Sequence, residues 1–521
     1  MSEKSKVAPL QVFHGQSQTA TYRQQLVRSY DGNPLIEAQP NILSVPDAMK
    51  LLAYHPIFDP KDRNLPPEIR IHQIQGAMRF FEPLPIHIDI EQRFSRMIRD
   101  GYVGRNPVAK GHWQELDKRV DIIAKSGGIP LQSSAANGFL IVGLPGMGKT
   151  FTVERLLQLY PQILNHTEYQ GKPFSRIQVT WLKLTCPHDG SIKGLALSFF
   201  QAIDDLLGTD YYKLCTGNGK RTVDELIPAM ARVAWAHCLG LLVVDEVQHL
   251  NNSKSGGADR MLGFFLQLMN TLGLPVLLIG TYAALSILNR ELRQIRRSSG
   301  LGDVVWERMP NDDVWKLFVE GLWRYQYVRN PVSLNKELSD TLYDECQGIT
   351  DFAVKLFILA QIRAIVSGHE KITAAIIRSV AHDSLRLAKP VLQALRTGKT
   401  EELAAMSDIH PIEIPSAIRD IQRKQLLGKL SENSQSTNEG NGQLADSKSL
   451  ESTQMSSAGC TASFRNGRAK KVRRPKKNEV ASQCSLVQTA NEGVKNGVSA
   501  HDALVASGAI KPLFNPKRHT I

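Results

Sequence analysis

The segment FLIVGLPGMGKT at positions 139–150 combines an apolar run, three glycines and a closing Lys-Thr pair. It fits the pattern G-x-x-x-x-G-K-[ST], in which glycines let the backbone curl so that successive N–H groups point at phosphate oxygens. We expect Lys149 to reach the outer phosphates of a nucleoside triphosphate and the Thr150 hydroxyl to bind Mg²⁺. A chance glycine turn is the alternative, but the apolar strand before the loop and the helical pattern after it favour a phosphate-binding loop. The loop glycines are Gly143, Gly146 and Gly148.

An acidic pair follows a second apolar run, LLVV at 241–244. We expect Asp245 to hold Mg²⁺ and Glu246 to polarise the attacking water, because both tasks need a carboxylate on a rigid strand end within hydrogen-bond reach. An exposed acidic turn after a core strand is the alternative. A third run, VLLIG, ends before Thr281, whose hydroxyl we expect to contact the outer phosphate or the attacking water.

Three arginines lie in the segment ELRQIRRSSG at 291–300. An arginine that reaches the nucleotide of a neighbouring subunit stabilises transition-state charge and accelerates hydrolysis ~10³–10⁵-fold. We expect one of the three to act in this way, and a solvated basic helix end is the alternative for each of them. The candidates are Arg293, Arg296 and Arg297.

The elements that must position these residues alternate along the middle of the chain. Short unbroken Val/Ile/Leu strands between amphipathic helices predict an α/β fold, with a parallel sheet covered by helices on both faces. Strands are expected at 138–144, 176–186, 240–247, 274–281 and 303–310. Helices are expected at 151–160, 192–207, 222–238 and 258–272.

Four regions follow from the change of pattern along the chain. The first contains extended proline-containing pieces, such as YDGNPLIEAQP and FFEPLPIHIDI, and one helix that we expect Gly101 and Gly104 to stop. The last has no Trp or Tyr and cannot bury enough apolar surface to offset its ordering entropy. The regions are an N-terminal extension for partner or subunit contacts (1–110), a nucleotide-binding core (111–310), a helical lid (311–430) and a mostly disordered basic tail (431–521).

The phosphate loop, the acidic pair, Thr281 and the arginine segment, in this order and followed by a helical lid, resemble the AAA+ superfamily of P-loop ATPases. A finer resemblance, over about residues 20–410, is to TnsC and the related TniB-type proteins, which are ATPase regulators of bacterial transposons with several-subunit transposases. It rests on MIRDGYVGRNP, TCPHDGSIKGLALSFFQAIDDLLG, AHCLGLLVVDEVQHLNNSKSGG, MLGFFLQLMNTLGLPVLLIGT and VKLFILAQIRAI.

This resemblance implies an ATPase that uses ATP and Mg²⁺ and oligomerises on duplex DNA as a ring or helical filament. Such proteins receive a signal from a TnsD/TniQ-type target selector and activate TnsA/TnsB-type transposase subunits, and hydrolysis releases or remodels the oligomer.

The resemblance also implies two further nucleotide contacts. Tyr102 and Val103 lie where these ATPases often hold adenine, and a helix-terminating loop is the alternative there. Many AAA+ lids supply an arginine to the outer phosphate. Here Asp351 stands in that place, and Lys355 one helical turn later is the candidate for the contact, with a surface lysine as the alternative.

DNA contacts are expected in two loops. In the TnsC group, the region corresponding to 185–194 tracks the DNA backbone, so we expect Ser191 and Lys193 to bind phosphate without reading sequence. An ordinary capped helix start with a solvated lysine is the alternative. The second basic loop, at 211–222, offers Lys213, Lys220 and Arg221.

The formal charge of +13 favours an anionic partner such as nucleic acid, although a merely basic protein is also compatible with it. In the tail, RNGRAKKVRRPKK at 465–477 is interpreted as a DNA tether, a docking site for a transposase subunit, or a solvated run. The six cysteines include no C-x-x-C pair, which indicates free thiols. The sequence shows neither a signal peptide nor an 18-residue apolar run, so we expect a cytoplasmic protein.

The sequence alone leaves two other functions open. One is another AAA+ DNA machine, such as an initiator or a clamp-loader-like ATPase. The other is a small-molecule P-loop kinase, which needs an acceptor pocket; the acidic pair, the helical lid and the positive charge argue against it.

Overall fold

The computed structural model describes residues 16–124, 138–217, 219–253, 257–284, 301–398 and 414–423. All of these lie in one unit, 1–441. The three candidate arginines Arg293, Arg296 and Arg297 lie outside the described residues, as do the tail 431–521 and its basic run.

Five parallel strands form the central sheet, in the order β5-β6-β7-β2-β8. Their registers place Thr185 beside Asp245 and Val142 beside Gly280, so the strands end at one edge of the sheet. The predicted parallel sheet is therefore confirmed. The strands are β2 (Phe139–Gly143), β5 (Trp181–Thr185), β6 (Leu241–Asp245), β7 (Val276–Gly280) and β8 (Val304–Trp306).

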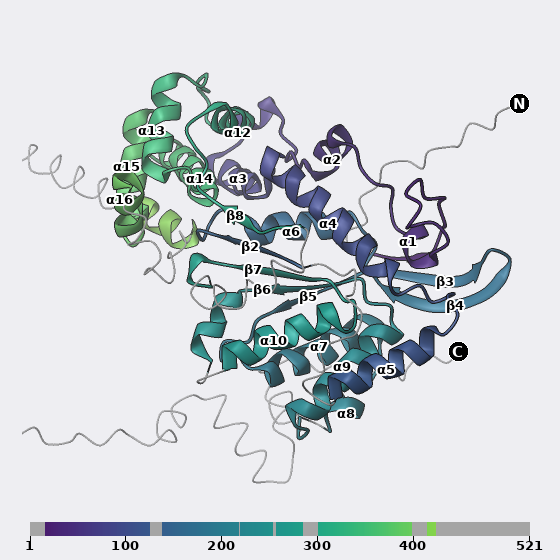
Figure 1. Cartoon of the computed structure of the whole chain (residues 1–521). Helices are drawn as coiled ribbons and strands as arrows, with labels where there is room; N and C mark the ends of the chain where they lie inside the picture. Colours follow the sequence, from purple (N-terminus) through teal and green to yellow (C-terminus); the bar gives the residue numbers. More distant parts are fainter. Residues whose placement is uncertain are drawn as a thin grey trace, which may run out of the picture. The chain divides into compact units, whose positions relative to one another are not determined.

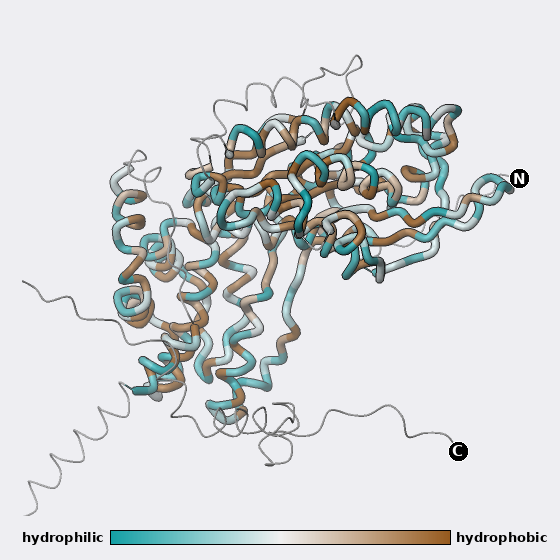
Figure 2. The backbone as a smooth tube through the Cα atoms, turned by 90° about the horizontal axis from the view of Figure 1, so that it is seen from below, coloured by the Kyte–Doolittle hydropathy of each residue, from teal (hydrophilic) through white to brown (hydrophobic). Residues whose placement is uncertain are grey.

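Both faces of this sheet are buried, as Val/Ile/Leu-rich strands require. Successive side chains alternate between two cores: in β6, Leu241 and Val243 belong to one apolar cluster, whereas Leu242 and Val244 belong to the other. One face is covered by α4 (Pro85–Val103) and α6 (Lys149–Leu157) (Figure 1). The other is covered by α7 (Ile192–Leu207), α9 (Val223–Ala236) and α10 (Gly257–Asn270), and α5 (His112–Ala124) packs on α9 (Figure 1). The hydrophobic segments lie inside, and the outward turns are mostly hydrophilic (Figure 2).

The prediction of one continuous strand at 176–186 is wrong. This segment contains parts of two strands, β4 (Lys172–Val179) and β5, which belong to different sheets. The break is at Thr180, which is fully buried and donates its N–H to the Gln162 carbonyl at 2.9 Å. Strand β4 instead pairs antiparallel with β3 (Ile163–Tyr169), and β1 (Ser17–Thr19) pairs parallel with β3. An apolar pattern that continues across the break hid the change of sheet. The last central strand, β8, is also shorter than the predicted 303–310.

The N-terminal region is more helical than its prolines led us to expect. Pro34 and Pro85 do not extend the chain but begin helices, where the fixed φ and the missing N–H of proline are tolerated. The helices before α4 are α1 (Pro34–Glu37), α2 (Val45–Leu52) and α3 (Pro67–Ile74), with 3-10 turns η1 (Pro60–Asn64) and η2 (Gln75–Arg79).

Helix α4 runs through Gly101 and ends at Gly104, so the prediction that Gly101 stops it is wrong. The reason for a glycine at position 101 is a close approach. A Cβ built there would lie 2.3 Å from Cγ of Pro275, just before β7. Gly104 is the C-cap and has no atom within 4 Å of a built Cβ.

The helices predicted after Pro310 are confirmed in the described part of this region. They are α12 (Asp313–Trp323), α13 (Lys336–Cys346), α14 (Thr350–Val366), α15 (Ala374–Ser384), α16 (Lys389–Thr397) and a helix over 414–423. Helix α14 is buried over most of its surface and forms the centre of this helical group. The group is joined to the N-terminal region by an ion pair between the fully buried Arg70 of α3 and Glu370, at 2.6 Å. We call residues 313–397 the lid.

The cysteines of the described segments are free, in agreement with the sequence. No helix among the described residues is long and apolar enough to span a lipid bilayer.

Substituting Gly101 with alanine is expected to lower the free energy of unfolding by about 1–2 kcal/mol. The added methyl collides with the rigid Pro275 ring, and this overpacking exceeds the ~1 kcal/mol that alanine gains over glycine in a helix. Urea unfolding measures the change. Gly104→Ala on the same helix end is the matched control and leaves the midpoint nearly unchanged. Equal stability of the two variants would contradict the close-approach argument.

Candidate nucleotide-binding site

The loop between β2 and α6 has the backbone shape expected of a phosphate loop. Gly146 and Gly148 adopt φ values of +80° and +85°, which side chains other than glycine rarely tolerate. Gly148 caps the N-terminus of α6, so the positive end of that helix faces the loop. Gly143 lies against β8, where a Cβ would meet the Trp306 carbonyl oxygen at 2.2 Å. These glycines therefore serve loop geometry and close strand packing.

Lys149 begins α6 and is folded back over the loop. Its Nζ donates to the carbonyl oxygens of Gly143 at 2.9 Å and Leu144 at 2.8 Å. Burial lowers the pKa of Lys149 to about 8, against the opposing attraction of Glu246 and Asp245. A buried ammonium with neutral carbonyl partners is suited to an incoming anion, since charge-assisted bonds to phosphate are stronger.

Thr150 and Asp245 meet although they are 95 residues apart in the sequence. The Thr150 hydroxyl lies 3.0 Å from Oδ2 and 3.3 Å from Oδ1 of Asp245, whose side chain is buried. Hydroxyl and carboxylate oxygens are the ligands that Mg²⁺ takes beside phosphates, so this pair fits the expected ion. Lys183 of β5, which no sequence motif marked, also reaches Asp245 at 3.4 Å and pairs with Glu154 at 2.6 Å.

Glu246 and Thr281 follow the ends of two neighbouring strands. Glu246 adopts a left-handed backbone conformation, φ 58° and ψ 39°, and donates its N–H to Asp245 Oδ1 at 2.9 Å. Such strained conformations of non-glycine residues are concentrated at functional sites. The hydroxyl of Thr281 is buried without a hydrogen-bond partner within the described structure. An unpaired hydroxyl on a residue that lines the same cavity as the acidic pair fits a phosphate or a water that binding would bring.

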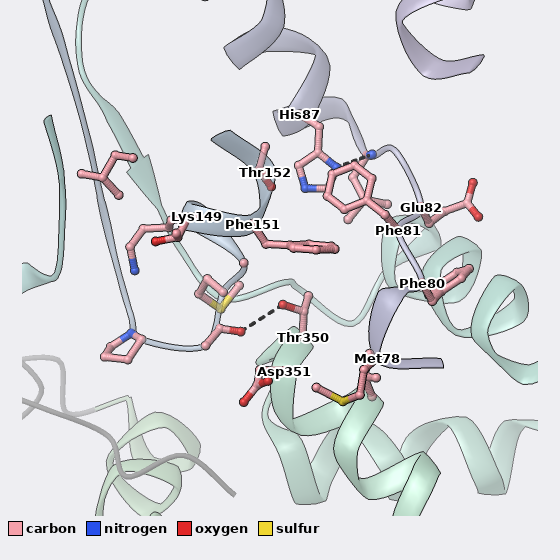
Figure 3. A pocket seen from close by; sticks show the side chains of 18 of the residues that line it. Met78, Phe80, Phe81, Glu82, His87, Lys149, Phe151, Thr152, Thr350 and Asp351 are labelled. Atoms are coloured by element: carbon pink, nitrogen blue, oxygen red, sulfur yellow. Dashed lines mark hydrogen bonds between the residues drawn. The ribbon is translucent and has the colours of Figure 1, made fainter. Parts of the chain in front are cut away.

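One cavity of about 440 Å³ joins these groups, within the range of about 300–1,000 Å³ that is usual for ligand sites. Its polar end contains the phosphate loop, Asp245, Glu246 and Thr281. Its other end is apolar and aromatic, and Figure 3 shows the Phe151 ring lying between the loop and Phe81. The apolar lining comes from Met78, Phe80, Phe81, Leu84, Phe151, Phe318 and Val354. A polar end for phosphates and an aromatic end for a base match the two halves of a nucleotide.

His87 of α4 adds a polar group to the aromatic end. The backbone N–H of Leu84 donates to His87 Nδ1 at 2.9 Å, which leaves the ring proton on Nε2 (Figure 3). The ring stacks on Phe81 with a centroid distance of 4.6 Å. Burial lowers the pKa of His87 to about 3, so the imidazole is neutral at ordinary pH. No motif in the sequence marked this end of the site; its sign in the sequence is the Phe80-Phe81 pair, which precedes Glu82 and Pro83.

We expected Tyr102 and Val103 to contact adenine, but neither residue lines this cavity. Tyr102 has no exposed surface, and its hydroxyl donates to the Cys238 carbonyl at 2.8 Å. It packs beside Gly240, where a Cβ would meet its hydroxyl at 2.4 Å. Because α4 continues to Val103 instead of ending earlier, Tyr102 is directed into the core between α4 and the sheet.

We also expected Lys355 to contact the outer phosphate, but Lys355 does not line the cavity. Its Nζ forms an ion pair with Asp351 at 2.7 Å, and the carboxylate-bearing Asp351, not Lys355, lines the cavity. The lid instead contacts the phosphate loop itself. The Gly146 carbonyl accepts from the Asp351 N–H at 3.0 Å. It also accepts from the Thr350 hydroxyl at 3.1 Å (Figure 3).

The candidate DNA contacts lie outside the cavity. Ser191 caps α7, its hydroxyl accepting from Gly194 N–H at 3.1 Å, and Lys193 follows half-buried in the first turn. Lys213 in α8 (Tyr211–Thr216), Lys220 and Arg221 are exposed. Their role in DNA binding stays a prediction.

Residues 132–288 match the family described as AAA domain. Similar solved structures include the Orc1 protein of Aeropyrum pernix in complex with DNA (16% identity, 53% of this chain and 65% of that chain, TM-score 0.31). Others are a Walker-type ATPase of Pyrococcus abyssi (14%, 60% and 89%, TM-score 0.33) and a RuvB variant of Thermotoga maritima (13%, 53% and 68%, TM-score 0.27). The comparison with curated proteins finds no match.

The AAA-domain match, the order of the parallel strands and the phosphate loop together show the AAA+ P-loop fold that was predicted. Such a fold, with a hydroxyl and two carboxylates at the phosphate end, supports a nucleotide-hydrolysing P-loop ATPase in general terms.

Replacing Lys149 with methionine is expected to stabilise the nucleotide-free protein at pH 7. The folded chain releases the Lys149 proton near pH 8, whereas the unfolded chain keeps it to about pH 10.5. Below pH 8 the buried ammonium therefore costs stability, and this cost disappears as pH rises from 8 to 10.5. We expect a gain of about 1–3 kcal/mol at pH 7 that shrinks toward pH 10. Urea unfolding at both pH values measures it, and a less stable variant at pH 7 would contradict this electrostatic account.

Replacing Phe151 with alanine is expected to weaken ATP binding about tenfold, because aromatic contact with a base contributes ~1–3 kcal/mol. Tyr102→Phe is the control. This substitution removes the hydrogen bond to the Cys238 carbonyl and lowers the free energy of unfolding by about 1 kcal/mol. It should leave the affinity for ATP unchanged. Calorimetric titration separates the two effects. A larger affinity loss in the Tyr102 variant would restore the original adenine assignment.

Proposed function

We propose that this chain is an ATP-hydrolysing regulator of transposition. With ATP bound, it assembles on duplex DNA without reading sequence and links a target selector to transposase subunits. Hydrolysis then releases or remodels the assembly. The observation that carries the ATPase part is the meeting of Thr150, Asp245 and Glu246 at one end of a single cavity.

The phosphate loop and Lys149 would bind the triphosphate. The loop amides and the N-terminus of α6 attract the phosphates, and Lys149 exchanges its two carbonyl partners for phosphate oxygens. Thr150 and Asp245 would hold Mg²⁺. That ion, when bound, neutralises charge that develops on the phosphates.

Glu246 would orient and polarise the attacking water. Glu246 follows the end of β6 in a strained backbone conformation, and it lines the same cavity as Thr281, whose hydroxyl is buried without a partner among the described residues. A carboxylate in this place suits water activation. It therefore favours hydrolysis over transfer of a phosphoryl group to a small-molecule acceptor.

The DNA part of the proposal rests on charge and on the resemblance to the TnsC group. The net charge is +13, and Lys213, Lys220 and Arg221 are exposed near one another in the sequence, where they can neutralise backbone phosphates. One of the arginines at 293–297 would complete the site of a neighbouring subunit, which would make hydrolysis depend on assembly.

Glu246→Gln is expected to bind ATP but to hydrolyse it at least ~100-fold more slowly, because the water loses its general base. Persistent oligomers on duplex DNA should result, visible by electron microscopy after ATP addition. Lys149→Ala is the control that loses ATP binding and forms no such oligomers.

Near-normal turnover by the Glu246 variant would remove Glu246 from the reaction. Assembly by the Lys149 variant would refute the nucleotide switch. A protein that assembles on DNA with ATP but binds no transposase or selector subunit in pull-down assays would instead be another AAA+ DNA machine, such as an initiator or a clamp-loader-like ATPase.

A further inference from the structure

A side-chain amide connects the ends of the two strands that carry the catalytic candidates. Gln248 lies in the 3-10 turn η3 (Val247–Asn252), which begins directly after Glu246. Its Nε2 donates to the Glu246 carboxylate, and its Oε1 accepts the backbone N–H of Thr281 at 3.2 Å. One side chain thus bridges the end of β6 and the end of β7.

The bridge is tightly packed. A Cβ on Gly280 would lie 2.7 Å from Val247 and 3.1 Å from Gln248 Oε1, so the absence of a side chain at position 280 lets the amide lie across the strand end. The Val247 side chain is fully buried beneath the turn. Gln248 is therefore held from the side of β7 while it donates to Glu246.

The chemistry of the amide suits this place. A bridge between a carboxylate and a backbone N–H needs a donor at one end and an acceptor at the other, and a glutamine side chain supplies both. Leucine of similar size would supply neither. Glutamate would set a second negative charge beside the Glu246 carboxylate and would offer it no donor.

The rest of the turn is anchored separately. His249 Nδ1 lies 2.9 Å from the Cys186 carbonyl, and Asn252 donates to the His188 carbonyl at 3.1 Å. Asn251 donates to the Ala283 carbonyl at 3.0 Å. Removing the amide of Gln248 thus leaves the turn with three other attachments, whereas the Glu246 carboxylate loses its side-chain donor.

We propose that Gln248 is a positioning residue for hydrolysis. It fixes the position of the Glu246 carboxylate relative to Thr281, so that one water molecule can contact both the carboxylate and the Thr281 hydroxyl. This inference rests on the proposed function, since it takes Glu246 as the group that activates water.

The test measures steady-state ATP hydrolysis by the full chain with duplex DNA. We expect Gln248→Leu to lower kcat about 10- to 100-fold, the size of effect that a misplaced catalytic group produces, with KM for ATP unchanged. Gln248→Glu should lower kcat at least as much. Asn251→Ala on the same turn is the matched control and should keep the kcat of the unaltered protein.

A second measurement separates positioning from a general structural role. In the Glu246→Gln background, Gln248→Leu should cause no further loss of kcat, because no carboxylate is left to position. The inference is overturned if Gln248→Leu hydrolyses ATP like the unaltered protein. It is also overturned if the two losses multiply, or if KM rises with kcat unchanged. If the unaltered protein hydrolyses no ATP with or without DNA, the proposed function fails and this inference fails with it.

Discussion

The contact between the Thr150 hydroxyl and the Asp245 carboxylate depends on the whole sheet. It forms because β2 and β6 lie on either side of β7, all three run parallel, and all three end at the same edge. Moving either strand by one residue would exchange its two faces and separate the hydroxyl from the carboxylate. The two apolar cores, one on each side of the sheet, resist such a shift because each strand buries alternate side chains in both. The chemistry at the cavity is thus stabilised by packing far from it.

The cavity joins three parts of the chain. The N-terminal region supplies Phe80, Phe81 and His87, the core supplies the phosphate loop and the acidic pair, and the lid supplies Asp351 and Val354. Because Thr350 and Asp351 of the lid donate two hydrogen bonds to the Gly146 carbonyl, the first turn of α14 is attached to the loop that would hold phosphates. A nucleotide in the cavity would therefore contact the N-terminal region and the lid at once. Such an arrangement allows a bound nucleotide to change how the two regions are held together.

Local patterns predicted the central fold well and failed at particular places for physical reasons. Parallel strands buried on both faces are continuous apolar runs, and amphipathic helices have a clear period, so both were visible in one sequence. The break at Thr180 was not visible, because a strand that leaves one sheet and enters another keeps its apolar pattern. The course of α4 through Gly101 was not visible either, because the reason for that glycine is the ring of Pro275, 174 positions away in the sequence.

The same contrast between local pattern and long-range packing applies to the candidate site. The phosphate loop, Lys149 and the acidic pair were readable from the residues alone, because loop shape, helix start and strand end are set by neighbours within a few positions. The aromatic end of the cavity was not readable from the sequence. His87 reaches the cavity through the packing of α4 on the sheet, while Tyr102, on the same helix, is directed into the core. Phe81 lies just before this helix and is bridged to Tyr54, far from it in the sequence. Contacts between distant segments depend on which faces meet after folding, and one sequence does not specify those faces position by position.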